Sequence, residues 1–501
     1  MTMISRVLGF LRDMVIARLF GAGAGADAFF VAFRIPNFLR RLFAEGAFSP
    51  AFVPILSEYK IRRSKEDVQE LVDHVAGTLG VILFAVTMIG VIAAPLLVMV
   101  FAPGFLHDPE RYGLTAVMLR ITFPYLLFIS LTALAAGILN TYGSFSVPAF
   151  TPVFLNIAMI AAALWLAPHL EHPVYALAWG VFVGGLAQLL FQLPFLLRIR
   201  LLPRPRFQRG HEGVRRVIKL MLPAIFGVSV TQINLLFDTL IASFLVAGSV
   251  SWLYYSDRLL EFPLGVFGIA LGTVILPNLA QKHAEASTKE FSHTLDWALR
   301  CVLLIGAPAT VGLVVLAGPL LATLFYYGQF DVQDVQMSTR SLIAFSIGLL
   351  GFLFIKVLAP AFYARQDMRT PVRIGIIALV SNMVMTLMLV WSLKHAGLAL
   401  ATTLSAFLNS GLLYRALRKQ GAYQPQSGWR ALFMRMLAAN ILLGVVLWAG
   451  APEVSVWLAW PAHTRAWHLC AVILAGAVTY FGALWLCGLR LKDVLIRPTT
   501  E

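Results

Sequence analysis

The sequence has 501 residues, of which 59% are hydrophobic and 13% are charged. Soluble domains carry about 25% charged residues, so this composition excludes an ordinary soluble protein and predicts a polytopic membrane protein. The formal net charge of +15 would suit a nucleic-acid-binding protein, but the placement of the charges along the chain excludes nucleic acid as a partner, as shown below.

Long apolar stretches recur from one end of the chain to the other. A membrane-crossing helix needs about 20 mostly apolar residues. The predicted fold class is therefore all-α, with about fourteen membrane-crossing helices. We expect them at residues 3–21, 27–57, 74–101, 113–140, 149–167, 174–197, 217–247, 250–281, 295–322, 338–364, 372–393, 397–414, 429–450 and 466–489.

Lysine and arginine are concentrated in alternate connections between these stretches. They are densest between Arg198 and Lys219, whereas the other set of connections contains Arg111, Lys394 and Arg465. Basic connections mark the cytoplasmic side of a membrane protein. This pattern predicts that both termini are cytoplasmic, and it explains most of the net positive charge without nucleic acid.

The second half of the chain repeats features of the first half at an offset of about 225 residues, as in transporters built from internal repeats. Asp13 and Gly23 align with Asp238 and Gly248. The repeat predicts an N-terminal lobe of six helices over 1–198, a basic linker over 199–216, a second six-helix lobe over 217–419, and two extra helices over 429–490. Tryptophans flank the connection between these last two helices and are expected at the membrane surface: Trp457, Trp460 and Trp467.

The first two spans carry more charge than a lipid-facing helix tolerates. Arginine near the bilayer centre costs at least several kcal/mol, yet these spans contain Arg6, Arg12, Arg18, Arg34, Arg40 and Arg41. Asp27, Arg34 and Arg41 are seven residues apart, so they lie near one helix face. Glu45 follows one turn later, and the Pro36-Asn37 pair is expected to kink the helix.

Two interpretations of these charges are open. They can line a water-filled, cationic cavity that binds an anionic headgroup, because a planar guanidinium binds two phosphate oxygens at once. Alternatively, Arg41 and Glu45 form a local ion pair, and Arg6 and Arg18 extend to the membrane surfaces. We favour the cavity, whose candidate binding residues in this region are Arg6, Arg12, Asp27, Arg34, Asn37, Arg40, Arg41 and Glu45.

The second lobe adds three candidate binding residues. Arg258 lies about two turns into its span, where it either faces the cavity or pairs with Glu261 three residues later. Lys356 lies deep in the tenth span and is a further candidate.

A cation site is a separate hypothesis. Oxygen-bearing side chains of adjacent helices can hold Na⁺ or accept a proton, and the candidates are Asp238, Asn382, Thr386 and Thr402. The alternative is that Asp238 is hydrogen-bonded and holds helices together.

Motifs of covalent chemistry and of tightly bound cofactors are missing from the sequence. There is no GxxxxGK[ST] phosphate loop, no HExxH motif and no cysteine–histidine cluster. The histidines are scattered, and His74 is expected to satisfy a helix interface. We expect a protein that moves or binds a molecule, with no cofactor, driven by Na⁺, by H⁺ or by the membrane potential.

Three long motifs resemble the MurJ (MviN) family. They are SRVLGFLRD followed by GADAFFVAFRIPNFLRRLFAEGAFSPAFVPIL, then GSVSWLYYSDRLLEFPLGVFGIALGTVILP, and KVLAPAFYARQDMRTPV. The resemblance implies a flippase for lipid II, an undecaprenyl-pyrophosphate carrying a disaccharide–pentapeptide, in the bacterial inner membrane. It also implies the fold of the multidrug/oligosaccharidyl-lipid/polysaccharide (MOP) exporters, with a groove for the lipid tail on the last two helices. The family's important charges fall on Arg6, Arg12, Asp27, Arg40 and Arg258; it favours Arg40 where helical spacing favours Arg41.

The expected partners are thus lipid II, membrane phospholipids and other proteins of cell-wall synthesis. The alternatives are an exporter of another polyprenyl-linked saccharide, a drug/cation antiporter of the same fold, a polyprenyl-phosphate glycosyltransferase, and a non-transporting scaffold. A cationic cavity argues against the antiporter, and the missing acidic metal motifs argue against the glycosyltransferase.

Overall fold

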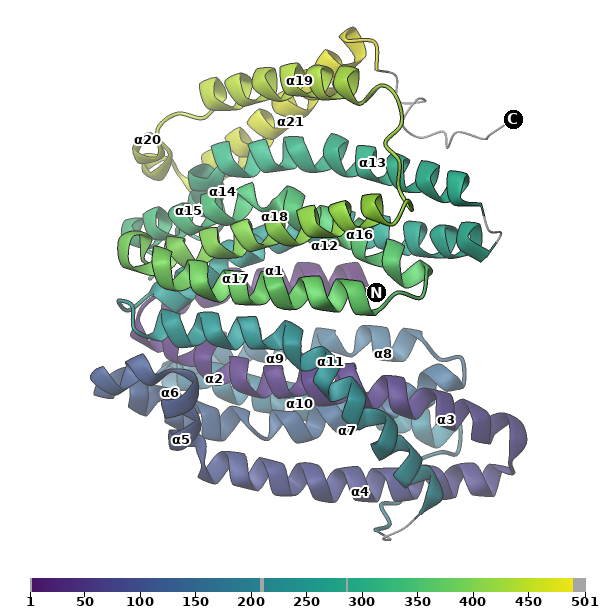
Figure 1. The fold of residues 1–501 in the computed structure, drawn as a ribbon. Helices are drawn as coiled ribbons and strands as arrows, with labels where there is room; N and C mark the ends of the chain where they lie inside the picture. Colours follow the sequence, from purple (N-terminus) through teal and green to yellow (C-terminus); the bar gives the residue numbers. More distant parts are fainter. Residues whose placement is uncertain (1, 208–210, 285–286, 490–501) are drawn as a thin grey trace. The chain divides into compact units, whose positions relative to one another are not determined.

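The computed structural model describes residues 2–207, 211–284 and 287–489, with the side chains of 2, 3, 45, 226–231, 267–276, 283 and 284 left out. Throughout these ranges the regular elements are helices joined by short turns, and no strand occurs (Figure 1). The predicted all-α fold class is therefore confirmed.

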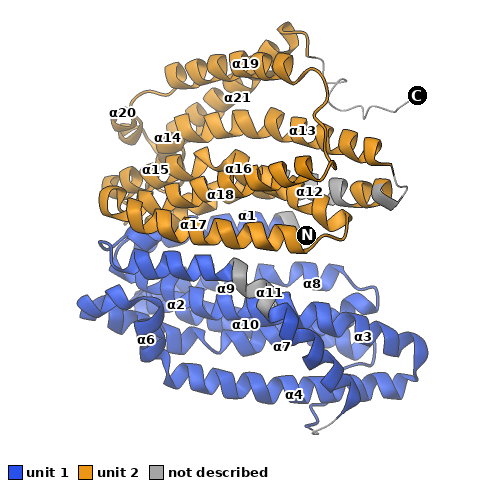
Figure 2. Ribbon diagram, in the orientation of Figure 1, with its two compact units in different colours: residues 1–251 blue, residues 252–501 orange. Residues whose placement is uncertain are grey.

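Contacts between residues divide the chain into two compact units, residues 1–251 and residues 252–501 (Figure 2). The helix that follows the basic linker, α11 (Glu212–Ser243), belongs to the first unit because it packs against the second predicted span and α4. The lobe boundaries that the repeat predicts remain a prediction about internal symmetry.

The first unit contains eleven α-helices within its described residues, together with two π-helical and two 3₁₀ segments. They are α1 (Thr2–Phe20), α2 (Ala24–Arg40), η1 (Arg41–Phe48), α3 (Ser49–Arg62), α4 (Lys65–Ile92), α5 (Ala94–Phe101), η2 (Pro103–His107), α6 (Pro109–Thr122), α7 (Tyr125–Thr141), α8 (Ser146–Phe150), α9 (Pro152–Ala161), η3 (Ala162–Leu166), η4 (Ala167–His169), α10 (Tyr175–Arg198) and α11.

The second unit is formed by the helices that follow, except that the first residues of α12 belong to the first unit. They are α12 (Ser249–Ala284), α13 (Thr288–Val315), α14 (Ala317–Leu324), α15 (Val332–Ile347), α16 (Leu349–Ala364), α17 (Arg369–Leu393), α18 (His395–Lys419), α19 (Trp429–Gly450), α20 (Val454–Ala459) and α21 (Ala462–Leu486).

Ten helical stretches among the described residues are long and apolar enough to cross a membrane. They are Lys65–Ile92, Pro109–Thr141, Ser146–His169, Tyr175–Arg198, Thr288–Val315, Val332–Ala364, Arg369–Leu393, His395–Lys419, Trp429–Gly450 and Ala462–Leu486. The other four predicted spans coincide with α1, with α2–η1–α3, with α11 and with α12. The total of fourteen crossings remains a prediction.

Close helix packing in both units depends on small residues. A Cβ atom on Gly180 or on Gly184 of α10 would lie 2.9 Å from a Cα atom of α9. In the second unit, a Cβ on Gly351 of α16 would lie 3.1 Å from the backbone of Ala406 in α18. Small residues allow such close approach in membrane proteins, where van der Waals contact replaces the hydrophobic effect between helices.

The second predicted span contains an irregular segment beyond its proline. The helix α2 continues through Pro36 to Arg40, and the π-helical η1 follows it. The kink at Pro36-Asn37 remains a prediction. π-Segments insert an extra residue into a turn, so helical spacing counted from Asp27 does not extend past Arg40. Trp457 was expected at the membrane surface, but it is fully buried and its Nε1 donates to Thr323 Oγ1 at 2.9 Å.

The basic linker lies along α4 over residues 202–206, which we call the linker strap. The Arg204 backbone N–H donates to Asp73 Oδ1 at 2.7 Å, and the Arg206 N–H donates to the Asp73 carbonyl at 3.0 Å. Gln69 Nε2 donates to the Leu202 carbonyl at 3.0 Å. At Gly77 a Cβ would lie 2.3 Å from the Arg206 carbonyl oxygen, so the strap fits against α4 only because residue 77 has no side chain.

Replacing Gly77 with alanine should therefore displace the strap. We expect trypsin to cleave the Gly77→Ala protein after Arg206 several times faster than the wild type, as followed by mass spectrometry of the first fragments. Gly80→Ala is the matched control, because nothing lies within 4 Å of a Cβ at Gly80. Equal cleavage rates in both variants would contradict this account of the strap.

Candidate functional site

Arg12 is buried inside the first unit and bonded on both sides. Its Nε and Nη2 donate to Asp13 Oδ1 at 3.0 and 2.7 Å, and its Nη1 donates to Asn156 Oδ1 of α9 at 3.1 Å. Asn156 Nδ2 in turn donates to the Ser5 carbonyl at 3.1 Å. Arg12 therefore fastens α1 to α9, whereas Arg6, one and a half turns away on α1, is exposed.

The three arginines of the second predicted span, Arg34, Arg40 and Arg41, differ in their hydrogen-bond partners and burial. Arg34 Nη1 donates to Thr239 Oγ1 of α11 at 2.7 Å. Arg40 Nε donates to Asn37 Oδ1 at 2.8 Å, one turn earlier on α2. Arg41 is half-buried, and the side chain of Glu45, its expected partner, lies outside the described residues. Arg34 and Arg40 thus have partners inside the first unit.

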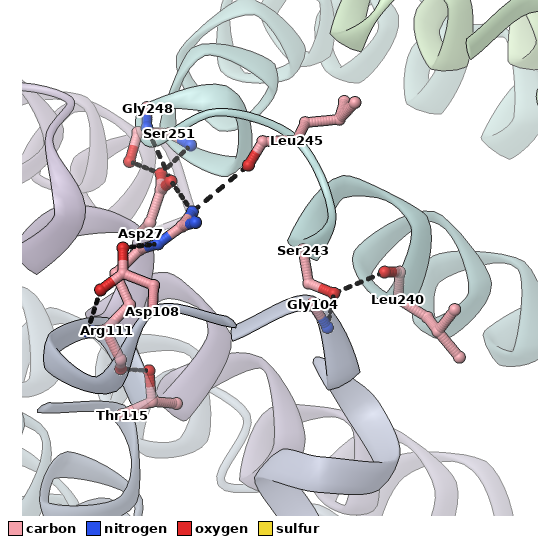
Figure 3. Close-up of polar contacts among 10 residues, drawn as sticks. All are labelled: Asp27, Gly104, Asp108, Arg111, Thr115, Leu240, Ser243, Leu245, Gly248 and Ser251. Atoms are coloured by element: carbon pink, nitrogen blue, oxygen red, sulfur yellow. Dashed lines mark hydrogen bonds and ion pairs between the residues drawn. The ribbon is translucent and has the colours of Figure 1, made fainter. Parts of the chain in front are cut away.

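Asp27 is fully buried and binds the beginning of α12 (Figure 3). Its Oδ2 accepts the Gly248 N–H at 2.7 Å, and its Oδ1 accepts the Ser251 N–H at 2.8 Å and the Ser251 hydroxyl at 2.6 Å. The first N–H groups of a helix lack partners within the helix and attract negative charge. Asp27 therefore caps α12 from another helix, with Gly248 at φ +97° in a turn that favours glycine.

Arg111 joins the same network from α6. Its Nη1 lies 3.9 Å from Asp27 Oδ2 and donates to the Leu245 carbonyl at 3.4 Å, and its Nε donates to Asp108 Oδ2 at 2.7 Å. Hydrogen bonds from the Arg111 backbone N–H and side chain, aided by the guanidinium charge, lower the pKa of Asp108. In the sequence, Arg111 is visible only as a charge in a connection, because Asp27 and Leu245 are distant in sequence and no local motif signals them.

The turn between α11 and α12 is held at a second point. The Gly104 N–H of η2 donates to Ser243 Oγ at 3.0 Å, and a Cβ on Gly104 would lie 2.3 Å from the Ser243 backbone (Figure 3). Together with the bonds to Asp27 and Arg111, this contact fixes the segment through which the chain leaves the first unit. We call these groups the Asp27 network: Asp27, Gly104, Asp108, Arg111, Ser243, Leu245, Gly248 and Ser251.

In the second unit, the candidate binding residues Arg258 and Lys356 are more exposed than Arg12 and Asp27 of the first unit. Arg258 Nη1 lies 2.6 Å from Glu261 Oε2, so the local ion pair with Glu261 is present, and about a third of the Arg258 side chain is exposed. The Arg258 guanidinium also lies over the Tyr254 ring, 5.8 Å from its centroid. Lys356 is exposed on α16, within a helical stretch apolar enough to cross a membrane.

The four residues of the predicted cation site belong to different units. Asp238 lies in the first unit, where Asn234 Nδ2 donates to its Oδ2 at 3.3 Å. Asn382 and Thr386 are buried on α17 in the second unit, and Thr402 Oγ1 donates to the Leu398 carbonyl at 3.0 Å. Both the cation site and the alternative, a helix-locking Asp238, remain predictions.

The fold defines the class of protein. A solved structure titled as an inward-facing multidrug resistance MATE family transporter of the MOP superfamily has a TM-score of 0.71 with 15% identity, covering 83% of this chain and 94% of its own. A second, titled as lipid II flippase MurJ in an inward closed conformation, has a TM-score of 0.80 with 26% identity, covering 97% of this chain and 98% of its own. The chain thus has the fold of MOP-type transporters, as the sequence predicts.

Sequence comparison then gives the family. The family model described as lipid II flippase MurJ matches residues 16–461. The probable lipid II flippase MurJ of Vibrio cholerae is 51% identical over 100% of this chain and 96% of its own length. The lipid II flippase MurJ of Burkholderia cenocepacia is 47% identical over 98% and 96%. The chain belongs to the MurJ family, and the prediction of a transporter in place of an enzyme is confirmed.

Breaking the Asp27 network should destabilise the protein. In Asp27→Asn, an amide NH₂ replaces one of the two accepting oxygens, and the charge opposite Arg111 is lost. Leaving buried donors unsatisfied costs about 1–3 kcal/mol each, so we expect a clear fall in the apparent melting temperature in detergent. Glu110→Gln on the exposed face of α6 should melt like the wild type. An unchanged melting temperature for Asp27→Asn would refute this role of the carboxylate.

Proposed function

We propose that this chain transports lipid II from the cytoplasmic to the periplasmic leaflet of the bacterial inner membrane, with both termini cytoplasmic. Close relatives covering nearly the full length are named lipid II flippases. The pyrophosphate and sugars of such a lipid cannot cross hydrocarbon unaided, because desolvating charged and polar groups is prohibitively costly. Alternating access solves this problem: the headgroup enters a water-filled cavity from one side and leaves on the other, while the tail stays in lipid.

The observation that best supports this mechanism is the exposure of Lys356 within an apolar helix. An exposed ammonium group at membrane depth is tolerated where it faces water or an anion. The partly exposed Arg258 adds a second cation in the same unit. Exposed Arg6 and half-buried Arg41 contribute cations from the first unit. These four side chains are our proposed contacts to the pyrophosphate.

The remaining candidates have a different role in this proposal. Arg12 and Asp27 are buried and bonded to other helices, so they position α1 and the start of α12 and do not touch substrate directly. Arg34, Asn37 and Arg40 become available when their present hydrogen bonds exchange. In this proposal, the carboxylates of Glu45 and Glu261 partly neutralise the positive charges of Arg41 and Arg258.

The energy source is proposed on physical grounds. A membrane potential that is negative inside favours moving negative charge outward by about 2.3 kcal/mol per charge per 100 mV. Na⁺ or H⁺ bound at Asp238, Asn382, Thr386 and Thr402 is a further coupling device. A drug/cation antiporter of the same fold would need acidic or aromatic groups in place of exposed cations, so it is the weaker candidate.

Removing one of the exposed cations should slow transport strongly without unfolding the protein. A charge-assisted hydrogen bond contributes about 1.5–3 kcal/mol, so Arg258→Ala or Lys356→Ala should reduce the rate at which lipid II reaches the outer leaflet by about 10- to 100-fold. Cells depleted of the native protein and carrying either variant should stop growing and accumulate lipid II. The assay measures the fraction of lipid II accessible from outside intact cells.

Arg62→Ala is the matched control, since Arg62 is an exposed arginine in the last turn of α3. It should support growth and transport like the wild type. Full growth and normal lipid II distribution with both Arg258→Ala and Lys356→Ala, each present in the membrane at wild-type level, would overturn the assigned roles. Accumulation of a different polyprenyl-linked saccharide on depletion would overturn the substrate.

A test of cation coupling is separate from the test of substrate binding. If Asp238 holds Na⁺ or a proton, Asp238→Asn should remove the dependence of lipid II transport on the Na⁺ or pH gradient while leaving transport by membrane potential alone. Transport by Asp238→Asn that still responds to the gradient as the wild type does would exclude this carboxylate from coupling.

A further inference from the structure

Three potential metal ligands that are far apart in sequence meet beside the linker strap. Glu70 and His74 lie one turn apart on α4, and His211 lies at the end of the basic linker, just before α11. One ligand atom from each of the three lies within 4.8 Å of the others. The sequence motifs gave no sign of this cluster, because His211 meets α4 only through tertiary packing.

A hydrogen bond within α4 fixes the tautomer of His74 in a form that can bind a metal ion. Its ring is buried, and Nδ1 lies 2.8 Å from the Glu70 carbonyl oxygen. A carbonyl can only accept, so Nδ1 carries the hydrogen and Nε2 is the nitrogen with a lone pair. A bond from the other ring nitrogen to a backbone carbonyl is the arrangement that fixes and orients metal-bound histidines. This bond lies within α4, so the expectation that His74 satisfies a helix interface remains a prediction.

His211 supplies the second imidazole. Its ring stacks on that of His74, with centroids 4.6 Å apart and planes 13° apart. Its Nδ1 is buried and, within the described part of the chain, has no hydrogen-bond partner.

The surroundings hold the cluster together before any ion binds. Asp73, next to His74, accepts the backbone N–H of Arg204, and Gly77 lies directly under Arg206. Residues 204 and 206 of the strap are therefore held against α4 beside His74. Glu70 is exposed, so its carboxylate can move to meet an ion, and half-buried His211 can tilt its ring out of the stack.

We propose that Glu70, His74 and His211 form a binding site for a divalent transition-metal ion, with zinc as its best-fitting occupant. Two imidazoles and one carboxylate are a ligand set found in zinc proteins, with a water completing the tetrahedron. Calcium and magnesium are disfavoured because they prefer oxygen ligands. A bound ion would fasten the end of the basic linker to α4, at the segment that leads into α11.

Metal binding is measured on the full-length protein in detergent, with any affinity tag removed. Isothermal titration with Zn²⁺ should show one site per chain, and Co²⁺ should give the visible absorption of a tetrahedral complex. His211→Ala and Glu70→Gln should each weaken Zn²⁺ binding by at least about 10-fold, a loss that even outer-shell changes cause. Zn²⁺ should also slow trypsin cleavage after Arg206 in the wild type and not in His211→Ala.

His463→Ala is the matched control, because His463 is an exposed histidine at the start of α21, away from the cluster in the sequence and in the other unit. It should bind Zn²⁺ like the wild type. Absence of a Zn²⁺ site in the wild type, or wild-type affinity in His211→Ala, would overturn the proposal. Should His211→Ala fail to elute as a folded protein, Glu70→Gln decides, since Glu70 is exposed, and wild-type affinity there would equally overturn it.

Discussion

The cost of placing charge in hydrocarbon is the constraint on which this structure depends. Inside each unit, buried charges are matched to several donors or acceptors. Asp27 accepts three hydrogen bonds, and Arg12 is bonded to Asp13 and Asn156. Asp296 accepts bonds from Tyr423, Trp429 and Arg300, which fastens the segment before α19 to α13. By contrast, Lys356 is exposed, and Arg258 is partly exposed beside its partner Glu261.

The Asp27 network shows that a charged residue in a predicted membrane span can stabilise the fold. Asp27 is as deeply buried as any core residue, and its oxygens are occupied by the backbone and hydroxyl of the α12 start. Asp27 therefore holds the segment through which the chain passes from the first unit to the second. A flippase that works by alternating access needs such fixed points, because the segments between them are where movement occurs.

Sequence patterns were sufficient for the fold class and the family, since apolar length, basic connections and long motifs are local signals. They were insufficient to predict which side chains contact one another in the folded protein. Helical spacing could not extend past Arg40 because η1 is π-helical, and an i→i+5 segment is not visible as a pattern of residue types. Arg111, Ser251 and His211 were missed because each meets its partners through tertiary packing. The position of Trp457 beside a connection predicted a membrane-surface anchor, but its indole N–H donates to Thr323 inside the second unit.

The proposed mechanism requires Lys356 to face an aqueous, anion-binding space. This requirement is tested by the reaction of Lys356→Cys with a membrane-impermeant, negatively charged thiol reagent, in a protein whose Cys301, Cys470 and Cys487 are replaced by serine. Met388→Cys, an exposed apolar position on α17, serves as the comparison. We expect rapid labelling at 356, slowed by lipid II, and little labelling at 388. Labelling at 356 as slow as at 388, in membranes opened to both sides, would contradict the proposed mechanism.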